Sequence, residues 1–265
     1  MSEVRPAAVA GLFYPGSARE LRPLVEQYLQ LDSTSRPAPS AKAIIAPHAG
    51  YVYSGQIAAS AFRCFVQDRD TIRRIVLIGP AHRVPVDGVA LPGATGFDTP
   101  LGTVPIDPEW SARIIDMPQV SSSQEAHAPE HCLEVELPFL QVLLGEFSIL
   151  PLLVSDVSAA DLADVVERIW GGQETRFVIS SDLSHYMSYE VARELDRETA
   201  HQVVDMHGHV ASHRACGAVA INGFLEAARR QGLMPQLLDL RNSGDTAGDR
   251  SRVVGYGAFA FVEAS

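Results

Sequence analysis

At residues 42–55 the sequence reads KAIIAPHAGYVYSG, which predicts a strand, a loop and a helix in that order. The apolar run 43–46 is typical of a buried strand, and Pro47 ends it because proline has no N–H to donate to a sheet. Ser54 is placed to cap a helix whose apolar residues recur at helical spacing. His48 therefore follows a strand directly. Ligands of open α/β sheets collect beyond the carboxyl ends of strands, so this is a position typical of a site residue.

The same construction occurs twice more along the chain. The apolar residues 75–78 lead through Gly79-Pro80-Ala81 to His82. A buried-type strand at 177–180 leads through Asp182 to His185. Three strands thus each deliver a histidine to the loop that follows.

Strand and helix patterns alternate along the whole chain. This order predicts a layered α/β fold, with helices on both faces of a largely parallel or mixed central sheet. Two late strands, near 236–240 and 253–262, are expected to pair antiparallel. We expect a single domain over residues 1–265.

Composition narrows the function classes. The chain has 21 basic and 32 acidic residues, a formal net charge of −11, which argues against a phosphate-binding surface and against nucleic acid as a partner. No run of about 18 apolar residues and no signal-peptide pattern occurs, so we expect no membrane segment and a cytoplasmic location. Three scattered cysteines do not form a disulfide framework.

Histidine placement alone leaves two interpretations open. His48, His82 and His185 either form a shared metal or catalytic site or simply cap strands and bond backbone carbonyls. Asp182 either orients a histidine or binds a substrate hydroxyl near His185, or it simply caps a helix or turn. His131 lies at the end of the polar loop 121–131, from which it could reach a pocket as a supporting residue or as an acid/base group.

Cys216 also has two interpretations. A helix is predicted over residues 215–230, with Cys216 in its first turn, where the helix dipole would stabilise a thiolate and lower its pKa. Such a thiolate would be a soft metal ligand or a nucleophile. The alternative is a small apolar core residue.

Five motifs follow one another along the chain: Ala46-Pro47-His48-Ala49-Gly50-Tyr51, Gly79-Pro80-Ala81-His82, Glu130-His131 with Glu134 to Pro138-Phe139, Ser180-Ser181-Asp182 with His185, and Cys216-Gly217. In this order and combination they resemble the MEMO family. The resemblance implies a fold like that of the LigB-type class III extradiol dioxygenases, which are non-haem iron enzymes. It also implies a functional link to radical-SAM and AMMECR-type proteins, since prokaryotic members are commonly grouped with these.

The resemblance further implies a metal pocket on His48, His82 and Cys216, with Asp182 and His185 alongside and His131 nearby. Iron(II) is the expected metal, and copper or zinc would also suit the donors, because a thiolate replaces the carboxylate of the dioxygenases. After Cys216-Gly217 a His-Pro pair of some relatives is replaced by Ala218-Val219.

Three functional hypotheses follow from the sequence. The first is a metal-dependent, dioxygenase-like oxidoreductase of unknown substrate, in which His185, oriented by Asp182, acts as acid/base and His131 handles a second proton. The second is a binding protein that holds a small molecule, a peptide or a metal without turnover. The third is a zinc hydrolase.

Overall fold

The computed structural model describes residues 4–30, 38–206 and 208–263. Its centre is a nine-stranded sheet in the order β10-β11-β1-β8-β2-β7-β3-β6, with β9 paired to β11, and a separate hairpin is formed by β4 and β5. The strands are β1 (Ala43–Ala46), β2 (Arg74–Pro80), β3 (Val89–Leu91), β4 (Gly96–Thr99), β5 (Gly102–Pro105), β6 (Val120–Ser122), β7 (Ser148–Val154), β8 (Thr175–Ser180), β9 (His185–Met187), β10 (Leu233–Asn242) and β11 (Val253–Glu263).

The middle of the sheet is parallel, as predicted. Strands β1, β8, β2 and β7 run in the same direction, and β1 and β8 are buried along their whole length. Strand β11 pairs antiparallel with both β1 and β10, which confirms the expected antiparallel final pair. The sheet is therefore mixed, with its parallel strands at the centre.

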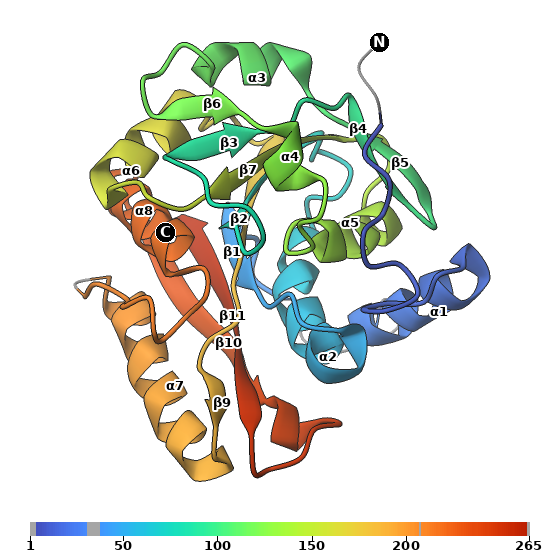
Figure 1. The fold of residues 1–265 in the computed structure, drawn as a ribbon, viewed down its shortest axis with the longest axis vertical. Coiled ribbons are helices and arrows are strands. Elements are labelled where there is room, and N and C mark those ends of the chain that lie inside the picture. The colour runs from blue at the N-terminus through green and yellow to red at the C-terminus, as the bar shows by residue number, and fades with distance from the viewer. Residues whose placement is uncertain (1–3, 31–37, 207, 264–265) are drawn as a thin grey trace.

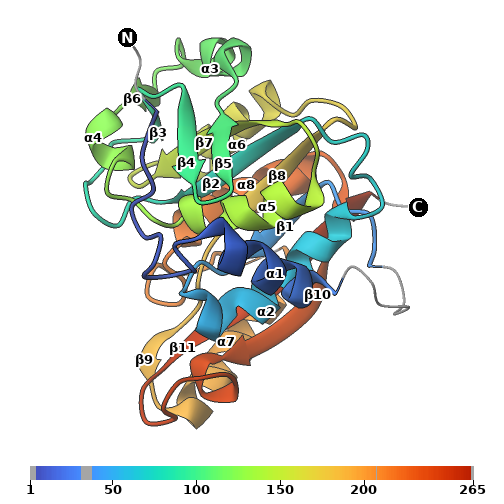
Figure 2. The same cartoon turned by 90° about the vertical axis from the view of Figure 1, so that its right-hand side faces the viewer.

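Helices cover both faces of the sheet (Figures 1 and 2). Helices α1, α2 and α5 pack on one face, and α3, α6, α7 and α8 pack on the other. The layered α/β architecture is confirmed. The helices are α1 (Ala18–Leu29), α2 (Tyr51–Phe62), α3 (Pro108–Ile114), α4 (Gln124–His127), α5 (Leu137–Leu143), α6 (Ala159–Arg168), α7 (Tyr189–Asp205) and α8 (Ala218–Arg230), with 3-10 turns at Arg63–Phe65, Glu134–Glu136 and Ser243–Asp245.

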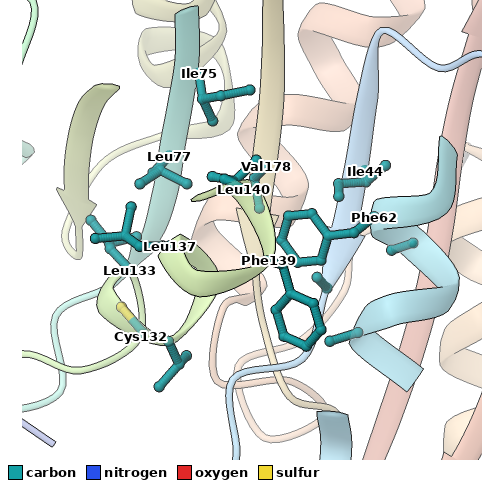
Figure 3. Packing of buried hydrophobic residues seen from close by; sticks show 14 of the residues in the cluster. Ile44, Phe62, Ile75, Leu77, Cys132, Leu133, Leu137, Phe139, Leu140 and Val178 are labelled. Carbon is teal, nitrogen blue, oxygen red and sulfur yellow. The ribbon is translucent and has the colours of Figure 1, made fainter. Parts of the chain in front are cut away.

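Strand β1 shows how the two cores divide. Ile44 belongs to the core under α1, α2 and α5, whereas Ile45 belongs to the core under α8, because successive strand residues point to opposite faces. Figure 3 shows the first core, in which Phe62 of α2 and Phe139 of α5 lie over the sheet. Their rings are stacked, with centroids 4.9 Å apart. This packing fixes α2 and α5 against the strands that carry the site.

Helix α2 begins earlier than the sequence predicts. It starts at Tyr51, with Gly50 at the N-cap position, so Ser54 lies inside the helix and donates to the Ala49 carbonyl oxygen at 2.9 Å. The backbone N–H of Tyr51 donates to the carbonyl of Phe13 at 2.7 Å. A segment distant in sequence therefore satisfies the helix start, and the expected serine cap is wrong. Among the described residues, no helix is long and apolar enough to cross a membrane.

Candidate metal centre

Three neighbouring parallel strands bring the predicted histidines to one edge of the sheet. Strands β1, β8 and β2 are adjacent, in that order. His48 lies two residues beyond β1, His82 two residues beyond β2, and His185 opens β9 after the short loop that follows β8. All three line one cavity of about 860 Å³, together with His131 and Cys216.

Three imidazoles in this cavity lie close enough together to hold a metal ion. One ring nitrogen from each of His48, His82 and His131 lies within 4.8 Å of the others. The ring centroids are 5.2 Å apart for His48 and His82, 5.5 Å for His48 and His131, and 5.0 Å for His82 and His131. His131, which the sequence suggests as an acid/base group, therefore stands beside the two predicted ligands.

Glu130 holds two of these rings in place. Its Oε1 lies 3.0 Å from His82 Nδ1 and 3.1 Å from His131 Nδ1, and its Oε2 accepts the backbone N–H of His82 at 2.6 Å. Burial acts to raise the pKa of Glu130, but its close contacts with the His131 and His82 imidazoles and the backbone N–H of His82 outweigh burial and hold the pKa well below its usual range. An ionised carboxylate at both Nδ1 atoms favours the N–H there, so the Nε2 lone pairs are left for a ligand.

His48 is positioned from the other side of the cavity. Its Nδ1 lies 2.8 Å from Ser180 Oγ, and its backbone N–H donates to Asp182 Oδ1 at 2.9 Å. Burial, reinforced by the neighbouring His82 and His131, lowers the pKa of His48 well below its ordinary value. A neutral imidazole at neutral pH is the form that binds metals.

Cys216 lies beside His48 but outside the helix expected to hold it. Helix α8 begins at Ala218, and the backbone N–H groups of Cys216 and Gly217, which precede it, donate to the loop after β8. The predicted first-turn position is therefore wrong. Cys216 Sγ is 3.3 Å from His48 Nε2 and accepts the backbone N–H of Asp182 at 3.3 Å.

The thiol is also less acidic than the sequence suggests. Burial, and then the nearby Asp182 carboxyl, raise the pKa of Cys216 to about 12. The expected lowering by a helix dipole is wrong because Cys216 is not in a helical turn. A raised pKa favours the thiol at neutral pH, and a bound cation would favour the thiolate instead.

Asp182 and His185 are both at the cavity but are not hydrogen-bonded to each other among the described contacts. Asp182 is buried, and its Oδ2 lies 4.0 Å from His48 Nε2. Its Oδ1 accepts the backbone N–H of His48 at 2.9 Å, so Asp182 positions the His48 segment. The expected orientation of His185 by Asp182 stays a prediction. His185 is half-buried in the cavity wall, with its ring centroid 5.8 Å from that of Tyr186.

Two supporting residues escape interpretation from sequence alone. Glu130 joins His82 across 48 positions, and Ser180 joins His48 across 132. Contacts over such separations leave no periodic pattern in the sequence. The sequence offers only their positions, because Glu130 is adjacent to His131 and Ser180 stands at the carboxyl end of a strand.

Fold and site together define an α/β protein with a histidine-rich candidate metal pocket at the carboxyl edge of its parallel strands. The chain belongs to the MEMO family: the profile of the family described as Memo-like protein matches residues 5–260.

Relatives and a solved structure agree with this assignment. A MEMO1 family protein of Aquifex aeolicus is 35% identical over 272 residues, covering 98% of this chain and 99% of the relative. One from Methanosarcina acetivorans is 36% identical over 273 residues, covering 97% and 98%. An uncharacterized protein from Escherichia coli K12 has a similar structure, with a TM-score of 0.55, 12% identity, and coverage of 82% of this chain and 98% of that one. At this identity the structural likeness concerns the fold alone.

Proposed function

We propose that this chain binds a transition metal through His48, His82 and Cys216, with His131 in reach as a further donor, and uses it in a redox reaction. The observation that carries the proposal is that one ring nitrogen from each of His48, His82 and His131 lies within 4.8 Å of the others. The Cys216 thiol adds a donor 3.3 Å from His48 Nε2. Imidazoles suit iron, copper and zinc, and a thiolate favours copper(I) and zinc. Iron(II) is the first candidate because the family resemblance points to non-haem iron enzymes, and copper is the second.

The supporting residues fit this donor set. Glu130 and Ser180 occupy the Nδ1 sides of the three rings, which is the usual arrangement behind metal-bound histidines. Cys216 must lose its proton to bind, so metal affinity should rise with pH. Two imidazoles and one anionic ligand leave open positions for dioxygen or substrate, which is the chemistry that a non-haem iron or copper ion supplies.

The rest of the cavity is suited to hold a small molecule beside these donors. His185 faces the cavity and serves as the proton donor or acceptor for a bound substrate. His131 serves as a second proton-handling group if it is not a ligand. The half-enclosed volume of about 860 Å³ lies in the range of small-molecule sites.

A second candidate function is ligand binding without turnover. The cavity rim exposes Tyr53 and Tyr186, and the Arg252 guanidinium lies 4.6 Å from the centre of the Tyr186 ring. Aromatic and arginine side chains at an open rim are typical of peptide contacts. A functional link to radical-SAM and AMMECR-type proteins is a further proposal, supported by the family resemblance.

The test is metal analysis of protein purified without oxygen. Wild type should hold roughly one equivalent of metal, and His48→Ala and Cys216→Ala should lose most of it. His201→Ala, an exposed histidine of α7, is the matched control and should retain it. Equal metal content in wild type, His48→Ala and Cys216→Ala would overturn the proposed ligands.

Two further measurements separate the remaining alternatives. Loss of metal in His131→Ala makes His131 a ligand, and retention makes it a proton-handling residue. Metal-dependent oxygen consumption with catechols or thiols supports the enzyme. A loaded protein that consumes no oxygen but binds peptides supports the binding protein.

A further inference from the structure

Three buried glutamates, Glu130, Glu134 and Glu136, lie within one short segment, and Glu136 differs from the other two in its hydrogen-bond partners. Glu130 accepts the backbone N–H groups of His82, His131 and Cys132 in addition to its contacts with imidazoles. Glu134 accepts hydrogen bonds from the Arg5 guanidinium, the Tyr14 hydroxyl and the backbone N–H groups of residues 8 and 9. Both therefore have the surroundings of ionised carboxylates.

Glu136 has none of these partners. It is fully buried, and its Oε1 contacts the Ser180 hydroxyl at 2.7 Å, while Oε2 has no hydrogen-bond partner among the described residues. No ion pair joins it to a cation in the described part of the chain. Burial raises the pKa of Glu136 well above its ordinary value, outweighing the Ser180 contact. An ionised carboxylate with one neutral partner would be costly at such a position.

The number of protons available at the Ser180 hydroxyl also indicates that Glu136 is protonated. Ser180 Oγ lies 2.8 Å from His48 Nδ1, 2.8 Å from the Cys132 carbonyl oxygen and 2.7 Å from Glu136 Oε1. A hydroxyl has one proton and two lone pairs. The carbonyl can only accept, so the serine proton goes to Cys132. The two other contacts must then be donated to Ser180, by His48 Nδ1–H and by a protonated Glu136.

We propose that Glu136 is a neutral carboxylic acid in the folded protein and acts as a positioning residue for His48. By donating to Ser180 Oγ, it keeps that oxygen an acceptor for His48 Nδ1–H and leaves the His48 Nε2 lone pair facing the cavity. Among the described residues, the Glu136 side chain makes its hydrogen bond to Ser180 and none to the cavity donors. The effect on metal binding rests on the proposed function, whereas the protonation of Glu136 is independent of it.

The protonation is tested on metal-free protein by infrared spectroscopy at neutral pH. The infrared spectrum of wild type minus that of Glu136→Gln should show the C=O band of a protonated carboxyl, and this band should shift on ¹³C-glutamate labelling. Glu134→Gln is the matched control: the same substitution, two residues away, should lack that band and lower the melting temperature, because it turns an amide toward hydrogen-bond donors. Absence of the band in the Glu136 difference would overturn the proposal.

The positioning role is tested with two readouts. Nitrogen NMR of His48 should show the Nδ1–H tautomer in wild type and in Glu136→Gln, whose amide can still donate to Ser180. Zinc affinity, measured by chelator competition, should be within about threefold of wild type in Glu136→Gln and roughly 10–100-fold weaker in Glu136→Leu. Should the leucine variant fail to fold, Glu136→Met, which is unbranched like glutamate and has no proton to donate to Ser180, provides the same comparison.

The outcomes separate the two proposals. A wild type that binds no zinc but shows the infrared band and the Nδ1–H tautomer contradicts the proposed function and leaves the role of Glu136 intact. Zinc binding that is weakened equally by Gln and Leu at position 136 contradicts the positioning role and leaves the metal centre intact.

Discussion

Replacing Asp196 by asparagine is expected to change how the stability of the protein depends on pH. Asp196, in α7, is 1% exposed, and its Oδ1 accepts the backbone N–H of Ser184 at 3.0 Å. Ser184 belongs to the loop that carries Asp182 and leads to His185, so this carboxyl supports the site. Burial raises the pKa of Asp196 to about 6 from 3.8, against the opposing hydrogen bond from Ser184.

The sign follows from these two pKa values. Below pH 3.8 the carboxyl is protonated in both the folded and the unfolded chain, so it contributes no difference. Above about pH 6 it is ionised in both, and the folded state carries the full penalty of burying the charge. About two pKa units at 1.36 kcal/mol each correspond to a penalty of about 3 kcal/mol. The penalty therefore grows as pH rises between the two values.

Denaturant unfolding of wild type and Asp196→Asn at pH 5 and pH 8 measures this. About half of the penalty is present at pH 5, so the free energy of unfolding of the variant should gain about 1.5 kcal/mol relative to wild type by pH 8. Glu146→Gln, which neutralises an exposed loop carboxylate, controls for loss of a charge, and its difference from wild type should stay constant. A pH-independent difference for Asp196→Asn, or one of opposite sign, would refute the reasoning.

Three further substitutions probe the site and the core. Glu130→Gln should weaken zinc binding by roughly tenfold or more while the chain stays folded, because the amide turns a donor toward the His82 backbone N–H. Chelator competition measures the affinity and circular dichroism checks the fold; unchanged zinc affinity would contradict this expectation. Gly217→Ala should destabilise the protein by about 1–3 kcal/mol and weaken zinc binding, because a Cβ at residue 217 would lie 2.6 Å from Ser181 Cβ and push the Cys216 turn away. An unchanged free energy of unfolding would show that the turn adapts to the added methyl group. Phe139→Ala should lower the free energy of unfolding by about 3–5 kcal/mol without altering the ligands, and a loss under 1 kcal/mol would contradict the stacked core.

The sequence predicts the parallel strands well because their signals are local. Apolar runs ending in proline mark β1 and β2, and each strand end places a histidine at the same edge of the sheet. The parallel pairing of β1 and β2 with β8 then brings His48, His82 and the loop of His185 to one cavity.

The supporting contacts could not be predicted in this way because they depend on distant parts of the chain. Helix α2 starts at Tyr51 since Phe13 accepts its N–H, and α8 starts late since the loop after β8 binds the N–H groups of Cys216 and Gly217. The protonation expected for Glu136 likewise depends on its contact with Ser180 and on the absence of a cation paired with it among the described residues, which only the packed structure specifies.

The most direct test of the proposed centre is X-ray absorption spectroscopy of the zinc- or iron-loaded protein. The proposal predicts imidazole nitrogen scatterers and one sulfur, at about 2.3 Å in the zinc form, with the sulfur absent in Cys216→Ala and part of the imidazole signal lost in His48→Ala. A spectrum of oxygen scatterers without sulfur or imidazole, or one unchanged in both variants, would contradict the assignment of the metal to His48, His82 and Cys216.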